Sequence, residues 1–188
     1  RPYGLAGEVT SKNLYPYGHP YSWLTIGYVE DLNRVDVNDL KRFFLRWYGP
    51  NNAVVTVGGD VNTKEVVKLV EKYFGSIPPC PKVEKTILPA PKLEADRYVS
   101  MTDQYAKLPM LVCALPGVPS HHKDEAALDC LAEIIGGDNN SILYQKLVKT
   151  QRAQSAYASN PTDELAGSFQ FNIMTKPGTA LADMEKEV

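Results

Sequence analysis

Three histidines, His19, His121 and His122, are the side chains that most readily suggest metal chemistry in this chain of 188 residues. Catalytic zinc on a helix needs two histidines about four positions apart on one face, and a third ligand. No HxxEH or HxxxH pattern occurs in the sequence. His121 and His122 are adjacent and would point about 100° apart on a helix, so we expect them in a surface loop. His19 lies among aromatic residues, and we expect it to form a structural hydrogen bond rather than to bind metal.

Other catalytic motifs are also missing from the sequence. No GxSxG element is present to supply a hydrolase serine. The segments GGDVN (58–62) and GGDNN (136–140) match neither of the phosphate-binding patterns GxxxxGK[ST] and GxGxxG. Both segments are explained as turns and helix starts. Asp129 and Glu133 lie one helical turn apart and could hold a cation. Two carboxylates make a poor zinc site, so a solvated helix face or pairing with Lys123 is favoured.

The composition is typical of a globular protein, with 44% hydrophobic and 22% charged residues. A net charge of -2 gives no reason to expect nucleic-acid binding, since a phosphate binder normally shows a basic face. No apolar run approaches the roughly 18 residues of a membrane span, and the start lacks the pattern of a signal peptide. Because the chain does not begin with Met, we expect it to be a segment of a longer protein. Cys80, Cys113 and Cys130 form no CxxC pair, so we expect buried or incidental thiols.

Before residue 77 the pattern predicts two helices around one strand. A helix begins at Asp36, which forms a capping box with Asp39, and ends at Gly49 and Pro50. The apolar run 53–57 is suited to a buried strand. A second helix begins near Asn62 and ends at Gly75.

After residue 77 the composition changes. Prolines at positions 78, 79, 81, 89 and 91 predict a stiff linker, in which we place a domain boundary. The order of elements beyond it differs from the order before it. We predict strands near 97–104, 110–115, 153–159 and 168–175, helices at 124–135 and 142–149, and a helix start after Pro177-Gly178.

One set of motifs consists of HPY (19–21), YGPNNA (48–53), GGDV (58–61) and YFGSIP (73–78). Together these motifs resemble the second half of the first domain of the pitrilysin/insulinase (M16) family of zinc metallopeptidases. Residues 96–188 resemble the start of the next, non-catalytic domain. The resemblance implies an α+β fold, a two-layer α/β sandwich whose antiparallel or mixed sheet is flanked by helices. It divides the chain into a partial first domain (1–77), a linker (78–95) and a partial second domain (96–188).

The resemblance also implies where the catalytic groups should be. In the family, an HxxEH helix and a later Glu hold zinc, and the Glu of HxxEH is the general base. By the match, these elements lie upstream of Arg1. In the second domain the corresponding helix reads Asp129-Cys130-Leu131-Ala132-Glu133, and an expected Arg and Tyr are replaced by Val148 and Ser155. We therefore expect zinc in the parent protein, none in this chain, and no peptide cleavage by this chain alone.

Two functional hypotheses come from the resemblance. In the first, the chain is part of a zinc-dependent endopeptidase acting on peptides or unfolded segments, and it contributes chamber scaffold and substrate binding beside the remaining domains or a partner subunit. Strand residues Ser155, Ala156, Tyr157 and Ala158 are then candidates for pairing with a peptide backbone, with ordinary sheet packing as the other interpretation. In the second, the chain belongs to a non-catalytic partner or structural subunit. Family resemblance makes a bacterial periplasm or envelope location an expectation.

The strand predicted at 53–57 has its natural sheet partners upstream by the same resemblance. An unpaired apolar strand tends to pair with whatever strand is available. We therefore expect residues 53–57 to pair either with a second copy of the chain, giving a homo-oligomer, or with residues 96–175.

Overall fold

The structure is a computed structural model that describes residues 1–89 and 91–188. The chain packs into two units: Arg1–Thr25 together with Ile87–Val188, and Ile26–Thr86. We call them the sheet unit and the helical unit. They record packing within this chain and do not test the domain division predicted at 78–95.

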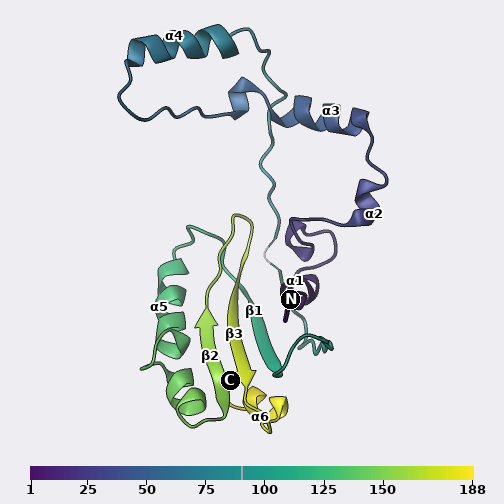
Figure 1. Ribbon diagram of the computed structural model, residues 1–188, viewed down its shortest axis with the longest axis vertical. Helices are drawn as coiled ribbons and strands as arrows, with labels where there is room; N and C mark the ends of the chain where they lie inside the picture. Colours follow the sequence, from purple (N-terminus) through teal and green to yellow (C-terminus); the bar gives the residue numbers. More distant parts are fainter. Residues whose placement is uncertain (90) are drawn as a thin grey trace. The chain divides into compact units, whose positions relative to one another are not determined.

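A three-stranded antiparallel sheet organises the sheet unit (Figure 1). It consists of β1 (Met110–Gly117), β2 (Ala153–Ser159) and β3 (Gly167–Thr175) in the order β1-β3-β2. Cys113 of β1 and Ala158 of β2 both lie opposite Phe171 of the central strand. Apolar and polar residues alternate along β3, which places one set of side chains on each face. The strands predicted at 110–115, 153–159 and 168–175 are thereby confirmed.

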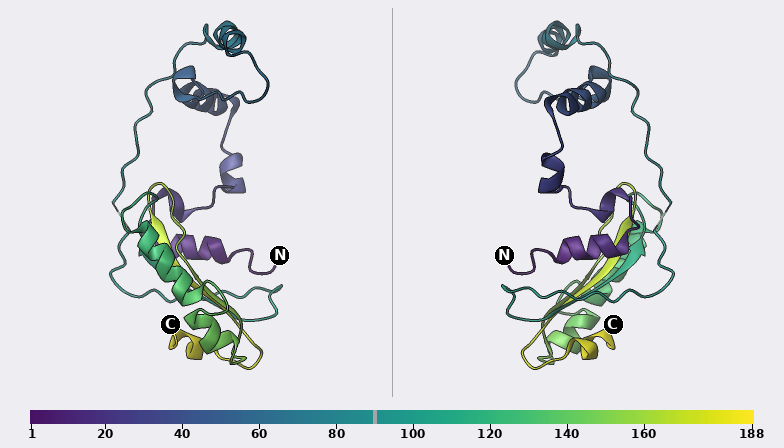
Figure 2. Two further views of the ribbon diagram at one scale, coloured as in Figure 1. Left: turned by 90° about the vertical axis from the view of Figure 1, so that its left-hand side faces the viewer. Right: turned by 90° about the vertical axis from the view of Figure 1, so that its right-hand side faces the viewer.

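Helices cover one face of this sheet and close the core (Figure 2). They are α5 (Glu125–Gly136), a π-helical turn η3 (Tyr144–Val148) and α6 (Leu181–Glu185). The predicted helices at 124–135 and after Gly178 are confirmed, and the one at 142–149 is helical with a π turn. The buried core residues are Ala132, Leu143, Leu147, Ala153, Ala158, Phe169, Ile173 and Met184. This arrangement is the two-layer α+β architecture expected from the sequence.

The N-terminal segment packs onto the same unit. It forms α1 (Ala6–Leu14) and a 3-10 turn η1 (Pro20–Ser22). Leu14 and Tyr15 are buried against Ala166, in the loop between β2 and β3. The Tyr3 hydroxyl donates to the Leu108 carbonyl at 2.8 Å. These long-range contacts tie residues 1–25 to the sheet.

The helical unit contains α2 (Val29–Leu32), α3 (Val37–Trp47), a 3-10 turn η2 (Pro50–Asn52) and α4 (Thr63–Phe74). Asp36 Oδ1 accepts from the amides of Asn38 and Asp39, and Asp39 Oδ2 accepts from the Asp36 amide, which confirms the predicted capping box. Asn62 caps α4 through the amides of Lys64 and Glu65. Both helices therefore begin where the sequence predicts.

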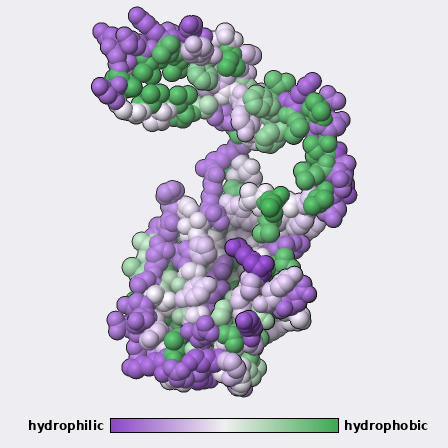
Figure 3. Space-filling model, viewed as in Figure 1, coloured by the Kyte–Doolittle hydropathy of each residue, from purple (hydrophilic) through white to green (hydrophobic). Residues whose placement is uncertain are grey.

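The apolar stripes of α3 and α4 are exposed. Neither helix contains a buried residue, and Figure 3 shows hydrophobic residues spread over the surface of this unit. Phe43, Phe44 and Tyr73 are each more than half exposed. Amphipathic helices gain most of their stability from packing such a stripe against a partner. The helical unit therefore lacks a core of its own among the described residues.

Two predicted strands do not form in the described part of the chain. Residues 53–57 are extended and exposed but pair with no described strand, so the predicted pairing with 96–175 is wrong, while pairing with a second copy remains a prediction. Residues 97–104 are also irregular. There the Asp103 carboxylate accepts from the amides of Tyr105 and Tyr3, which forms a turn instead of a ladder. An extended segment becomes a strand only where a neighbouring strand satisfies its backbone.

Candidate functional site: the open edge of the sheet

The outer edge of β2 is the candidate site. Within the described parts of the chain, β2 pairs only with β3, so one row of its backbone groups faces away from the sheet. Natural proteins usually protect such an edge with charged residues, proline or a covering element. The β2 sequence AQSAYAS contains no charge and no proline. The opposite edge strand, β1, carries Pro116 and is packed against α1.

The four residues predicted for this site lie on the two faces of β2. Ala156 and Ala158 face the helical layer and pack in the core cluster. Ser155 and Tyr157 face the other side, where Tyr157 is 48% exposed. A β-bulge between Ala153 and Ser155 shifts the register at the start of the strand. The structure thus brings all four onto one edge strand, and their pairing with a peptide stays a prediction.

Helix α5 lies directly on β2. A Cβ atom at Gly136 would lie 2.1 Å from the Ala158 nitrogen and 2.7 Å from the Tyr157 carbonyl carbon. Only glycine permits this approach of helix to strand. The close contact fixes the C-terminal end of α5 over Tyr157 and Ala158 of the candidate edge.

Asp129 and Glu125 of α5 accept hydrogen bonds from side chains that follow β2. Asp129 Oδ1 accepts from the side-chain amide of Asn160, which follows β2, at 2.9 Å. Asp129 and Glu133 are both exposed, which confirms the predicted solvated face. One turn earlier, Glu125 accepts from the Thr162 hydroxyl at 2.8 Å. Sequence reasoning missed Asn160 and Glu125, because their partners lie more than 30 residues away.

Helix α5 is where a zinc site of the family's kind would have to be in this chain. At the positions that match the family's zinc helix, Asp129 and Glu133 stand where histidines are expected, and Ala132 stands where a general base is expected. Asp129 is already hydrogen-bonded to Asn160. Among residues 1–89 and 91–188, no cluster of three or more His, Cys, Asp or Glu side chains could hold a metal ion. These residues do not fit a peptidase zinc centre.

His19 is a buried structural residue, as predicted. It is 4% exposed and stacks on Tyr15, with ring centroids 4.8 Å apart. Its Nδ1 accepts from the Tyr21 amide at 3.1 Å, so the proton of the neutral ring is on Nε2, which has no hydrogen-bond partner among the described residues. Burial lowers the pKa of His19. His121 and His122 lie in the turn before α5, where His121 is exposed.

The burial of His19 predicts a loss of stability at mildly acidic pH. Because the folded-state pKa is below the unfolded value of about 6.5, the unfolded chain takes up the proton first, and stability falls as pH decreases through that value. His19→Asn keeps a side-chain acceptor at the start of η1 but does not titrate. Urea unfolding at pH 7.5, 6.5 and 5.5 should show wild type losing more stability than this variant.

His122→Asn is the matched control for that comparison. His122 Nδ1 also accepts from the amide two residues on, that of Asp124, but at the surface. Equal pH dependence of wild type and His19→Asn would contradict the assignment of His19 as a neutral buried residue.

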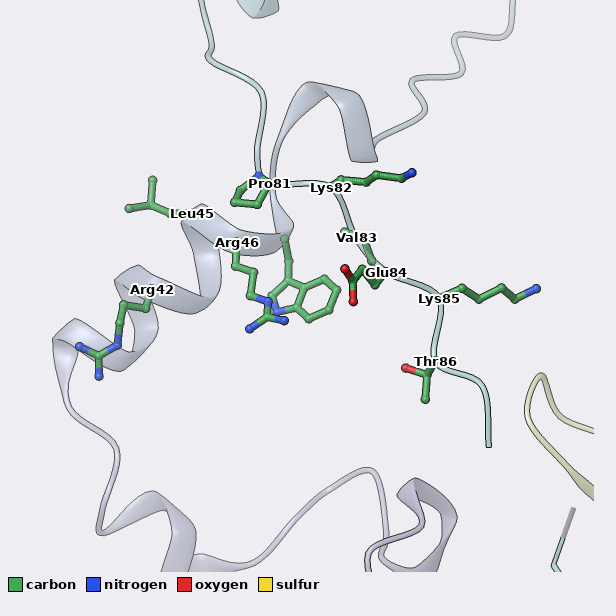
Figure 4. Close-up of a pocket in the computed structure, with 10 residues that line it drawn as sticks. Arg42, Leu45, Arg46, Pro81, Lys82, Val83, Glu84, Lys85 and Thr86 are labelled. Atoms are coloured by element: carbon green, nitrogen blue, oxygen red, sulfur yellow. The ribbon is translucent and has the colours of Figure 1, made fainter. Parts of the chain in front are cut away.

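An open cleft of about 990 Å³ is found within the helical unit (Figure 4). The side chains of Arg42 and Arg46 extend from α3, opposite the extended segment Pro81–Thr86 with its labelled lysines. Arg42 pairs with Asp39, and the Arg46 guanidinium lies 5.1 Å from the centre of the Trp47 ring. These two arginines are therefore already engaged.

None of the described helices is long and apolar enough to cross a membrane. The three cysteines are free, and they range from buried Cys80 to exposed Cys130. Buried Cys80 and exposed Cys130 agree with the prediction of buried or incidental thiols.

Known proteins share both the sequence and the fold of this chain. The family model of the peptidase M16 inactive domain matches residues 34–188. The zinc protease PqqE of Helicobacter pylori is 29% identical over 176 residues, which is 90% of this chain and 39% of that protein. A probable mitochondrial-processing peptidase subunit beta of Schizosaccharomyces pombe is 27% identical over 70% of this chain and 30% of its own length. The chain thus spans less than half the length of these relatives.

Solved structures of peptidase M16 proteins share the fold of this chain. A protease from Helicobacter pylori superposes with a TM-score of 0.67 at 28% identity, over 90% of this chain and 42% of that one. A peptidase M16 inactive domain from Pseudomonas fluorescens gives a TM-score of 0.69 at 18% identity, over 97% and 47%. At that identity the second match supports the fold alone. With the family model covering most of the chain, this protein belongs to the peptidase M16 family and contains its inactive domain.

Proposed function

We propose that this chain contributes scaffold and substrate binding to a zinc-dependent endopeptidase of the pitrilysin/insulinase type and does not itself cleave peptides. The unprotected outer edge of β2 is the observation that carries the proposal. An extended peptide can add to such an edge through main-chain hydrogen bonds, largely independent of its sequence. This suits an enzyme that acts on many peptides or unfolded segments.

The non-catalytic part of the proposal rests on chemistry. Hydrolysis at zinc needs ligands, a general base and groups that stabilise the developing oxyanion. At the matching positions this chain carries Asp129, Ala132 and Glu133, with Val148 and Ser155 where the family has its Arg and Tyr. Zinc and its ligands would belong to the parent protein, in the remaining domains or a partner subunit. The division into partial domains 1–77 and 96–188 is part of this proposal.

The expected affinity for peptide is modest. Pairing along residues 155–158 would form a few main-chain hydrogen bonds, each contributing about 0.5–1.5 kcal/mol net. Ordering the peptide offsets part of that gain. We expect dissociation constants of about 0.1–1 mM for this chain alone. Further contacts from the rest of a closed chamber would tighten peptide binding.

Proline substitution tests the pairing. Successive residues of an antiparallel strand direct their N–H groups alternately to the partner strand and away from it. Of the variants Ala156→Pro and Tyr157→Pro, one therefore removes an edge-facing N–H and the other an N–H bonded to β3. The edge-facing variant should unfold at the wild-type temperature and lose measurable binding of an extended test peptide in an NMR titration.

The other proline variant reports on the fold. Because it removes an N–H that bonds to β3, it should unfold at a lower temperature than wild type. Comparing the two variants therefore identifies the residue whose N–H faces outward. A folded edge-facing variant that binds the peptide with wild-type affinity would contradict the proposal. In that case the second function, a non-catalytic partner or structural subunit, becomes the better account, and binding to the other subunits becomes the property to measure.

A further inference from the structure

We propose that the pocket between α1 and the β1–β3 part of the sheet binds a small uncharged ligand through a carboxamide group. The pocket has a volume of about 150 Å³, and the residues that line it come from α1, β1 and β3. Because its β3 residues alternate with the core residues of that strand, it lies on the face opposite the helical layer. This inference goes beyond the proposed function and does not depend on it.

Helix α1 is held at both ends, and the space beneath its middle stays open. The Tyr3 hydroxyl, just before the helix, donates to the Leu108 carbonyl at 2.8 Å. At the other end, Leu14 and Tyr15 are buried in a hydrophobic cluster. A Cβ atom at Gly7 would meet no atom outside its own stretch of helix within 4 Å. The α1 residues that line the pocket are all small: Ala6, Gly7, Thr10 and Ser11. Such short side chains cannot fill the gap between helix and sheet.

Two carboxamides of the central strand, Gln170 and Asn172, line the pocket from the sheet side. Both residues are half-buried. Gln170 Nε2 donates to Ser168 Oγ at 2.8 Å, whereas no residue in the described part of the chain hydrogen-bonds to the Asn172 carboxamide. Asparagine is disfavoured inside strands, and covering a carboxamide without a partner costs stability. Departures of this kind from local preference are expected at functional sites, so we infer that Asn172 is there to bind a ligand.

The lining determines the class of ligand. No charged side chain is among the described residues that line the pocket, so an ionised ligand would lose its hydration there without gaining a counter-charge. A carboxamide has one acceptor and two donors, and it can therefore form two hydrogen bonds with the carboxamide of Asn172. The Ser11 hydroxyl offers a further polar contact, and Val112 offers an apolar wall for an alkyl group. The volume equals that of about five water molecules at roughly 30 Å³ each, which suits a small amide or an amide-bearing side chain.

An NMR titration of the full chain with propionamide and propionate tests the inference. The two probes have nearly the same shape, but only propionamide is uncharged and can donate. We expect propionamide to shift the side-chain amide signals of Asn172 and to bind about 10-fold more tightly than propionate. The variant Asn172→Val should bind propionamide about 10-fold more weakly. It should unfold at or above the wild-type temperature, because valine is favoured in strands.

A control variant and a pair of peptides complete the experiment. Asn38→Ala removes an exposed carboxamide from α3, and it should bind propionamide as wild type does. Acetyl-Gly-Gln-Gly-N-methylamide and its Glu counterpart distinguish the sources of the amide. If the Gln peptide binds more tightly than both its Glu counterpart and propionamide, the ligand is a peptide side chain. If it binds more weakly than propionamide, the ligand is a free small amide, and either result supports a carboxamide site.

Three results would overturn the inference. The first is equal binding of propionamide and propionate, and the second is wild-type binding of propionamide by Asn172→Val. The third is the absence of any shift at Asn172, which would mean that the pocket holds water alone. None of the three bears on the outer edge of β2, so the proposed function would stand.

Discussion

Replacing Gly136 with alanine is expected to destabilise the sheet unit by about 2 kcal/mol, although alanine is the better helix former. The added Cβ would lie 2.1 Å from the Ala158 nitrogen and 2.7 Å from the Tyr157 carbonyl carbon, both backbone atoms of β2. Relief requires α5 to move off the strand, which opens the core, and overpacking of this kind costs at least about 1–3 kcal/mol. The propensity gain of about 1 kcal/mol offsets only part of that.

Gly137→Ala is the matched control. The three atoms nearest to its Cβ would all belong to the carboxylate of Glu133, the far end of a flexible side chain that can turn into solvent. Urea unfolding followed by circular dichroism should therefore give near-wild-type stability for Gly137→Ala and a clear loss for Gly136→Ala. Equal stabilities for the two variants would contradict the close packing of α5 on β2.

Ile173→Ala is expected to cost about 2–5 kcal/mol, in the range of large-to-small changes in a closed core. Ile173 is fully buried on the central strand β3, opposite Leu111 of β1 and Ala156 of β2. No neighbouring strand can move to fill the space, because both are paired to β3. The unfolding temperature should fall on the order of 10 °C.

Ile134→Ala serves as its control, since Ile134 is 61% exposed on α5. A change there should stay within about 0.5 kcal/mol of wild type. If Ile173→Ala were as stable as Ile134→Ala by calorimetry, the core of the sheet unit would have to lie elsewhere.

Secondary structure could be predicted from the sequence best where local chemistry determines it. Asp36 and Asn62 cap helices whose starts follow directly from side-chain and backbone geometry. The strands at 110–117 and 167–175 follow from their apolar patterns, because both become paired. The same kind of pattern failed at 53–57 and 97–104, where no described strand supplies the missing hydrogen bonds. Strand formation depends on a distant partner, and periodicity carries no information about that partner.

The candidate site could likewise be predicted only in part from the sequence. Residues 155–158 could be placed on a strand from the sequence and by family resemblance. That this strand lies at the sheet edge depends on the order β1-β3-β2, which no local pattern specifies. The bond from Asn160 to Asp129 and the contact of Gly136 with β2 are likewise tertiary. Before the fold is known, Asp129 and Glu133 are indistinguishable from any solvated pair of carboxylates.

Amide hydrogen exchange on β2, measured residue by residue with and without a bound extended peptide, tests the central claim most directly. In the free chain, alternate amides of 153–159 should exchange rapidly, because they face the open edge. Saturating peptide should slow exchange at those alternate amides and leave the amides bonded to β3 almost unchanged. Peptide binding that leaves every β2 amide at its free-chain rate would contradict a binding edge on this strand.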